Sequence, residues 1–149
     1  MAALGFHCVS PVVASGTSAK TIVQVVAAAN HPVKVKGFSC SCQGTSNTAL
    51  PVLVELVRQS TAGTSSALTP VKAPSDDSDE TLQSTAVHSC TVEPTTGDVL
   101  RRGTVHPQTG YTEWFPHTEH IKVGGGDRLG VRVTAAADVN VVAELFCEE

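Results

Sequence analysis

Residues 121–146 read Ile-Lys-Val-Gly-Gly-Gly-Asp-Arg-Leu-Gly-Val-Arg-Val-Thr-Ala-Ala-Ala-Asp-Val-Asn-Val-Val-Ala-Glu-Leu-Phe, and this stretch decides the fold. Apolar and polar residues alternate in 128–134, which is the period of a half-buried strand. The glycine run at 124–127 predicts a hairpin turn, because glycine adopts the positive φ angles that tight turns need. We therefore expect a strand, a glycine turn, an alternating strand, a short polar turn and a last strand over 139–146.

The alternation also assigns the two faces of the strand at 128–134. Leu129, Val131 and Val133 are expected to face the core. Arg128 and Arg132 then lie on the opposite face, available to neighbouring subunits.

The composition restricts the class of protein. The chain has 149 residues, enough for one domain with one hydrophobic core, and its net charge is −4. Phosphate binding needs a concentrated basic face, so a nucleic-acid partner is not expected. The N-terminus lacks the cationic start and long apolar run of a signal peptide. No window reaches the roughly 18 consecutive apolar residues of a membrane span, so no membrane partner is expected either.

Short strands recur about every ten residues, with no convincing amphipathic helix. We expect them at 21–29, 33–42, 51–59, 85–93, 99–106, 111–115 and 119–123, before the final block. A helix competes at 21–29, where there are three alanines, but the valines, the isoleucine and the short length favour a strand. This spacing predicts an all-β fold, an antiparallel jelly-roll-like β-sandwich of about eight strands.

Three segments modify this pattern. Residues 1–19 predict an extended N-terminal arm that lies on its own domain or on a neighbouring subunit, leaving 20–149 as the β-sandwich domain. The apolar residues of the arm that would make these contacts are Leu4, Phe6, Val9, Val12 and Val13. Residues 60–80 predict a long polar loop. The alternation in 33–42 changes phase at Gly37, which predicts a bulge or a corner between sheets.

The histidines and acidic residues do not form a recognisable catalytic or metal-binding set. His117 and His120 are three apart, so on a strand or tight turn they should point to opposite faces. His88 is expected to be a hydrogen-bonded core histidine. The acidic run at 76–80 lacks the ligand spacing of a calcium loop and predicts a solvated loop.

The five cysteines also predict no site. Cys8, Cys40, Cys42, Cys90 and Cys147 are odd in number and irregularly spaced, which favours reduced core or rim residues. Cys40-x-Cys42 has no second pair nearby, so it lacks zinc-finger spacing. We therefore expect no catalytic residue, no cofactor and no metal, and a protein that is not an enzyme.

Tyr111, Trp114 and Phe115 are the one concentration of large rings in a chain with 4% aromatic residues. They are either a satellite of the core or an anchor in a subunit interface, where tryptophan and tyrosine are enriched.

Several stretches of the chain resemble small structural proteins of tailed-bacteriophage virions. They are residues 21–38, 61–67, 105–111 and 126–134. Separately, 126–133 and 141–146 are similar to the last strands of trimeric jelly rolls of the tumour-necrosis-factor and complement kind.

The resemblance implies a capsid decoration (cement) protein. Such a protein would be a homotrimer that binds and stabilises the major capsid protein lattice on the virion surface, after assembly in the host cytoplasm. The family offers no catalytic residues. The alternative is a receptor- or glycan-binding module of a phage tail or fibre, in which Tyr111, Trp114 and Phe115 form an exposed platform.

Overall fold

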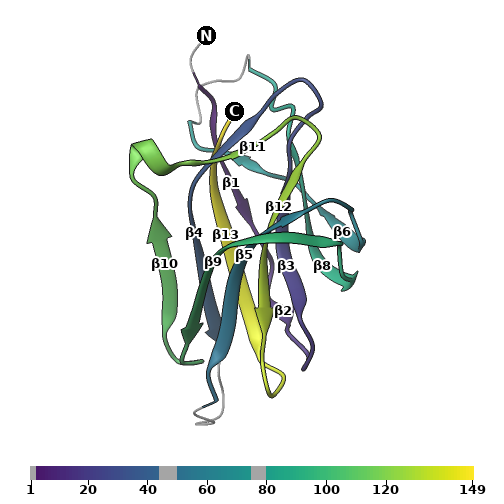
Figure 1. Cartoon of the computed structure of the whole chain (residues 1–149), viewed down its shortest axis with the longest axis vertical. Coiled ribbons are helices and arrows are strands. Elements are labelled where there is room, and N and C mark those ends of the chain that lie inside the picture. Colours follow the sequence, from purple (N-terminus) through teal and green to yellow (C-terminus); the bar gives the residue numbers. More distant parts are fainter. Residues whose placement is uncertain (1–2, 44–49, 75–79) are drawn as a thin grey trace.

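Two antiparallel sheets pack against each other, which confirms the predicted all-β sandwich (Figure 1). The computed structural model describes residues 3–43, 50–74 and 80–149. Sheet A contains β1 (Gly5–Val9), β2 (Val13–Ala14), β4 (Val33–Gln43), β7 (Val71–Lys72), β10 (Gly110–Trp114), β11 (Ile121–Val123) and β13 (Asn140–Glu148). Sheet B contains β3 (Lys20–Val26), β5 (Val52–Gln59), β6 (Thr64–Leu68), β8 (Thr85–Val92), β9 (Thr96–Val105) and β12 (Arg128–Thr134).

Eight of these strands pair in the nested order expected of a jelly roll. β1 pairs with β13, β3 with β12, β4 with β10 and β5 with β9, all antiparallel. The four pairs, taken in this order, alternate between sheet A and sheet B, so each half of the chain contributes to both layers. The remaining strands extend the sheets: β8 lies beside β3 and β6 beside β8 in sheet B, and in sheet A β7 lies beside β1, β11 pairs with β4 and β2 pairs with β13.

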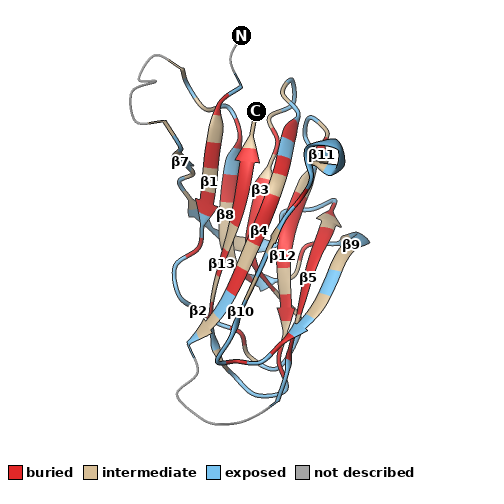
Figure 2. Ribbon diagram, turned by 90° about the vertical axis from the view of Figure 1, so that its left-hand side faces the viewer, coloured by how far each residue is buried: buried red, intermediate tan, exposed pale blue. Residues whose placement is uncertain are grey.

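The inner faces of the two sheets form one hydrophobic core (Figure 2). Leu129, Val131 and Val133 are completely buried in it, as their alternation predicted. The largest other buried side chains are Phe6, Ile22, Phe38, Leu56 and Leu145. Both the first and the last strand therefore contribute to the core.

The glycine run at 124–127 is not a hairpin turn, so that prediction was wrong. β11 pairs with β4 in sheet A, whereas β12 pairs with β3 and β5 in sheet B. The run carries the chain from one sheet to the other. Gly126 has a φ of +83°, and a Cβ on Gly125 would lie 2.3 Å from the carbonyl oxygen of Ala29. Glycine is therefore required at these positions because the chain crosses between the sheets, and not because it forms a hairpin.

The predicted N-terminal arm is instead part of the sandwich. β1 lies between β13 and β7 in sheet A (Figure 2). Leu4, Phe6 and Val13 are buried, whereas Val9 and Val12 are exposed. The physical reason is that residues 4–8 place alternate side chains in the core and find a complete strand, β13, to pair with.

The region predicted as a polar loop at 60–80 contains two strands. β6 pairs with β8 and β7 pairs with β1. Their serine-, threonine- and lysine-containing sequences escaped the hydrophobic pattern because both lie at sheet edges and are largely exposed. The acidic run predicted as a solvated loop lies outside the described residues except for Glu80.

The predicted bulge at Gly37 is confirmed. Phe146 pairs with Gly37, but the next residue of β13, Cys147, pairs with Val35, so Lys36 is the additional residue. The bulge reverses the alternation and thereby keeps both Val35 and Phe38 on the core side of β4.

Replacing Gly37 with alanine is expected to lower the free energy of unfolding by about 1–3 kcal/mol, the usual effect of overpacking. A Cβ there would lie 2.5 Å from the carbonyl oxygen of Glu113 and 3.2 Å from the Cα atom of Trp114. Urea denaturation followed by the fluorescence of Trp114 measures the change. Gly110→Ala in the paired strand is the control, because its Cβ would make contacts of 3.7 Å or longer. Equal stability of the two variants would contradict the assigned packing.

Candidate functional site

The outer face of sheet A carries a straight row of residues formed by strand register. Trp114 of β10 pairs with Gly37 of β4, which also pairs with Phe146 of β13. Phe146 pairs with His7 of β1, and His7 pairs with Val71 of β7. Because cross-strand partners share a face of the sheet, these residues cross sheet A side by side. We call Trp114, Phe146, His7 and Val71 the aromatic row.

Aromatic contacts hold the row together. The indole of Trp114 stacks on the ring of Phe146, with centroids 4.2 Å apart and an interplanar angle of 7°. His7 meets the same ring edge-on at 5.4 Å. Gly37 allows the stack, since it presents no side chain between β10 and β13. The row is thus an ordered surface rather than a set of independent side chains.

The aromatic row is open to solvent at both ends. Trp114 and Val71 are each 60% exposed, whereas Phe146 is covered by its neighbours. Val9, which pairs with Glu144 two residues along β1 from His7, is 42% exposed. A hollow of about 170 Å³ lies beside the row, and Lys36 and His120 also line it. Large exposed apolar side chains in one surface are typical of an interaction site.

Polar side-chain pairs lie along the aromatic row. His7 Nδ1 lies 3.0 Å from Glu144 Oε1, and Lys36 Nζ donates to Glu148 Oε2 over 3.1 Å. Burial raises the pKa of Glu148, but the hydrogen bonds and charges of Lys36 and Lys34 outweigh this and lower the pKa below its usual value. The surface therefore combines an apolar centre with an ionised polar rim, as interfaces commonly do.

The structure divides the predicted aromatic cluster. Trp114 alone points to the outer face of sheet A in the exposed row. Phe115 is buried in the core near Phe38, and the guanidinium of Arg101 lies 5.1 Å above its ring. Tyr111 is half-buried, packs on Phe38 at 5.4 Å and donates a hydrogen bond of 2.8 Å to Glu113. Tyr111 and Phe115 thus belong to the core and its edge.

The arm residues divide in the same way. Leu4, Phe6 and Val13 are buried and unavailable to a partner in this fold, while Val9 and Val12 remain exposed. The sequence reasoning missed Phe146, His7 and Val71. They lie in three different strands, and only the register of β10, β4, β13, β1 and β7 brings them into one row with Trp114.

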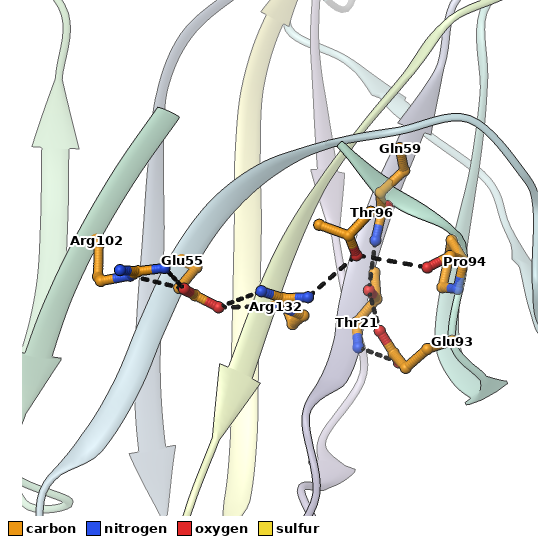
Figure 3. A network of polar contacts seen from close by, with 8 residues as sticks. All are labelled: Thr21, Glu55, Gln59, Glu93, Pro94, Thr96, Arg102 and Arg132. Atoms are coloured by element: carbon orange, nitrogen blue, oxygen red, sulfur yellow. Dashed lines mark hydrogen bonds and ion pairs between the residues drawn. The ribbon is translucent and has the colours of Figure 1, made fainter. Parts of the chain in front are cut away.

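The outer face of sheet B is polar and internally bonded (Figure 3). Glu55, only 3% exposed, accepts hydrogen bonds from Arg102 Nε at 2.8 Å and from Arg132 Nη2 at 2.6 Å. Arg132 also donates to Thr96 Oγ1 at 3.0 Å. The prediction that Arg132 is available to neighbouring subunits is therefore wrong: a buried carboxylate of its own chain binds it.

A second set of polar side chains continues this network. Gln24 donates to Gln59, Gln59 donates to Thr21, and Thr21 donates to Glu93, over 2.7, 2.7 and 2.8 Å. Gln24, Gln59 and Thr21 are buried on the outer side of sheet B, and Glu93 is partly buried there, because the segments joining β5 to β6 and β8 to β9 cross over it (Figure 1). The Ser60 amide donates to the Thr95 carbonyl and fastens the two segments to each other. The hydrogen-bond network therefore stabilises these two connecting segments on the outer side of sheet B.

One histidine prediction was wrong and a second was right only in part. The rings of His117 and His120 are 5.1 Å apart, because residues His117–Glu119 form a 3-10 turn instead of extended backbone. His88 makes the predicted hydrogen bond, with Nδ1 2.7 Å from Ser89 Oγ, but it is half-buried instead of lying in the core. Among the described residues, no group of three or more His, Cys, Asp and Glu is placed to hold a metal ion.

The five cysteines are free. Burial raises the pKa of the Cys40 thiol to about 12, with a further contribution from Cys42. Burial also raises the pKa of Cys90 to about 11, with Glu93 adding to the effect. Both thiols are therefore protonated at neutral pH and are poor nucleophiles.

Comparisons of the chain with protein-family models, with curated proteins and with solved structures find no match. In the described part of the chain, no helix is long and apolar enough to cross a membrane.

Proposed function

We propose that this chain is a non-enzymatic structural protein of a virion, a capsid decoration protein that assembles as a homotrimer and stabilises the major capsid lattice. The observation that carries the proposal is the solvent-exposed aromatic row on the outer face of sheet A. The virion setting and the trimer come from the sequence resemblance to phage structural proteins and trimeric jelly rolls.

The row has the composition of an interface centre. Tryptophan is the residue most enriched among those that dominate binding energy, especially where it is packed against other rings. Trp114 rests with one face on Phe146, so its orientation is fixed before any partner binds. A fixed side chain loses little conformational entropy on association, which favours binding. The rim of Lys36, Glu144 and Glu148 sets the partner's orientation.

Counting the copies of this chain in the virion that contains it tests the capsid assignment. Quantitative mass spectrometry against the major capsid protein measures the ratio. A decoration protein is expected in hundreds of copies. A handful of copies would contradict the proposal and indicate a tail or portal component.

The exposed face of the Trp114 indole favours a second function, a receptor- or glycan-binding module of a tail or fibre. In this alternative, the free face of the ring is the platform on which the ligand rests. The stacking of Trp114 on Phe146 is compatible with either function. A variant without the indole distinguishes them, because it loses self-association in one case and ligand binding in the other.

Trp114→Ala is expected to weaken self-association about 30-fold, which corresponds to roughly 2 kcal/mol for a dominant interface side chain. Sedimentation velocity over a concentration series measures the shift toward the monomer. Val99→Ala is the control, since Val99 is also exposed but lies on β9 of sheet B. If Trp114→Ala remains fully assembled and instead loses binding to host cells or glycans, the alternative function replaces the decoration proposal.

A further inference from the structure

We propose a second binding site, in a hollow at one end of sheet B, for a small neutral ligand rich in hydroxyl groups, such as one saccharide ring. The hollow has a volume of about 260 Å³. It lies where the end of β5, the start of β9 and the start of β12 meet in sheet B, whereas the aromatic row lies on sheet A. This site is independent of the proposed assembly function.

Positively and negatively charged side chains of the described residues line the hollow but form no ion pair with one another. Two arginines, Arg58 and Arg128, and two aspartates, Asp98 and Asp127, are among the residues that line it. Within the residues that the structure describes, none of these four groups takes part in an ion pair of 4.0 Å or less. Side chains that donate hydrogen bonds and side chains that accept them thus lie at the border of one hollow.

The guanidinium groups are positioned but have donors left. Arg58 Nη1 donates to the carbonyl of Lys122 over 3.2 Å, which connects the end of β5 to β11 in the opposite sheet. Arg128 Nη1 donates to Gln24 Oε1 over 3.4 Å. Each guanidinium carries five N–H donors. In the described part of the chain, these single bonds leave most of that capacity for a ligand.

The backbone leaves room for a ligand beside these groups. Gly97, at the start of β9, lines the hollow without a side chain. The neighbouring Gln59 is buried, and its side chain is fixed by hydrogen bonds to Gln24 and Thr21. The side of the hollow formed by Gln59 is therefore rigid and polar, and at Gly97 the hollow is bordered by backbone alone.

The charges select the chemical class of the ligand. Two carboxylates oppose the binding of an anion, and two guanidinium groups oppose the binding of a cation. A hydroxyl group can accept from arginine and donate to aspartate at the same time, so a polyol satisfies both kinds of group. The volume is below that of pockets for drug-sized ligands, about 300–1,000 Å³, and suits a single ring.

Nuclear magnetic resonance titration of the intact, isotope-labelled chain tests the site. The probes are the methyl glycosides of glucose, mannose and galactose, with inorganic phosphate and calcium as charged comparators. One of the glycosides is expected to shift the amide signals of Gly97, Asp98 and Arg128 in a saturable manner, with half-saturation in roughly the millimolar range. Phosphate and calcium are expected to leave these signals unchanged.

A double variant confirms the location. Arg58→Met combined with Asp98→Asn is expected to weaken glycoside binding at least tenfold, while Lys34→Met on sheet A leaves it unchanged. Unchanged signal dispersion in the remaining spectrum verifies that the variant is folded. The proposal is overturned if no glycoside gives saturable shifts at these amides, if phosphate or calcium binds there more tightly, or if the double variant binds normally.

Discussion

Deletion of residues 1–16 is expected to abolish the native fold. β1 pairs with β13 on one side and with β7 on the other, so its removal opens sheet A between two strands. Loss of the buried Phe6 side chain alone costs about 3–5 kcal/mol. A domain of this size is stable by about 5–15 kcal/mol in total, and the deletion also removes Cys8 and Val13 from the core.

Circular dichroism and urea denaturation measure this result. The truncated protein is expected to show neither a near-ultraviolet circular dichroism signal from ordered aromatic side chains nor a cooperative unfolding transition in urea. Val9→Ala is the matched control within β1, because its side chain is 42% exposed and its loss should change the stability by about 0.5 kcal/mol or less. If the truncated protein still unfolds cooperatively, residues 1–16 are a separate arm and not an integral part of sheet A.

Glu55→Ala is expected to lower the free energy of unfolding by about 3–5 kcal/mol, the usual effect of breaking a buried ion pair from one side. Glu55 is almost completely buried and is bound by both Arg102 and Arg132. The side chain of Arg132 is only 19% exposed, so it would remain largely desolvated without a carboxylate partner. Lys34→Ala is the control, because the exposed Lys34–Glu148 pair contributes about 0–1 kcal/mol.

The carboxylate of Glu55 should also make the free energy of unfolding depend on pH in the acidic range. Burial raises the pKa of Glu55, but hydrogen bonds from Arg132 and Arg102 outweigh burial and lower the pKa below 4.5. A lowered pKa in the folded state stabilises the protein above the unfolded pKa, and this contribution is lost as the pH falls through the folded value. Urea midpoints should therefore decrease below pH 4.5 more steeply in the native chain than in Glu55→Gln. Identical slopes would contradict the ionised network.

The alternation of side chains predicted most of the strands and their inward faces. Leu129, Val131 and Val133 are buried because a half-buried strand has a period of two, whatever its neighbours are. The phase change at Gly37 likewise predicted the bulge that keeps Val35 and Phe38 in one core. These features depend on short stretches of sequence, which is why they could be read without the structure.

Pairing between distant strands could not be read in this way. The glycine run at 124–127 has the local signature of a hairpin, but a crossing between sheets needs the same backbone freedom. The aromatic row depends on the register of β10, β4, β13, β1 and β7, and a shift of one residue in β10, β13, β1 or β7 would move the side chain of that strand to the other face of the sheet. Trp114 was therefore identifiable as a candidate, whereas Phe146 and His7 were not.

The molar mass of the purified native chain in solution, measured by sedimentation equilibrium at neutral pH, tests the central claim most directly. Association through the outer face of sheet A predicts the mass of three copies, about three times 15.4 kDa, at micromolar concentrations. A mass of one copy across the whole concentration range would contradict the account, because the aromatic row would then be exposed without binding a second copy.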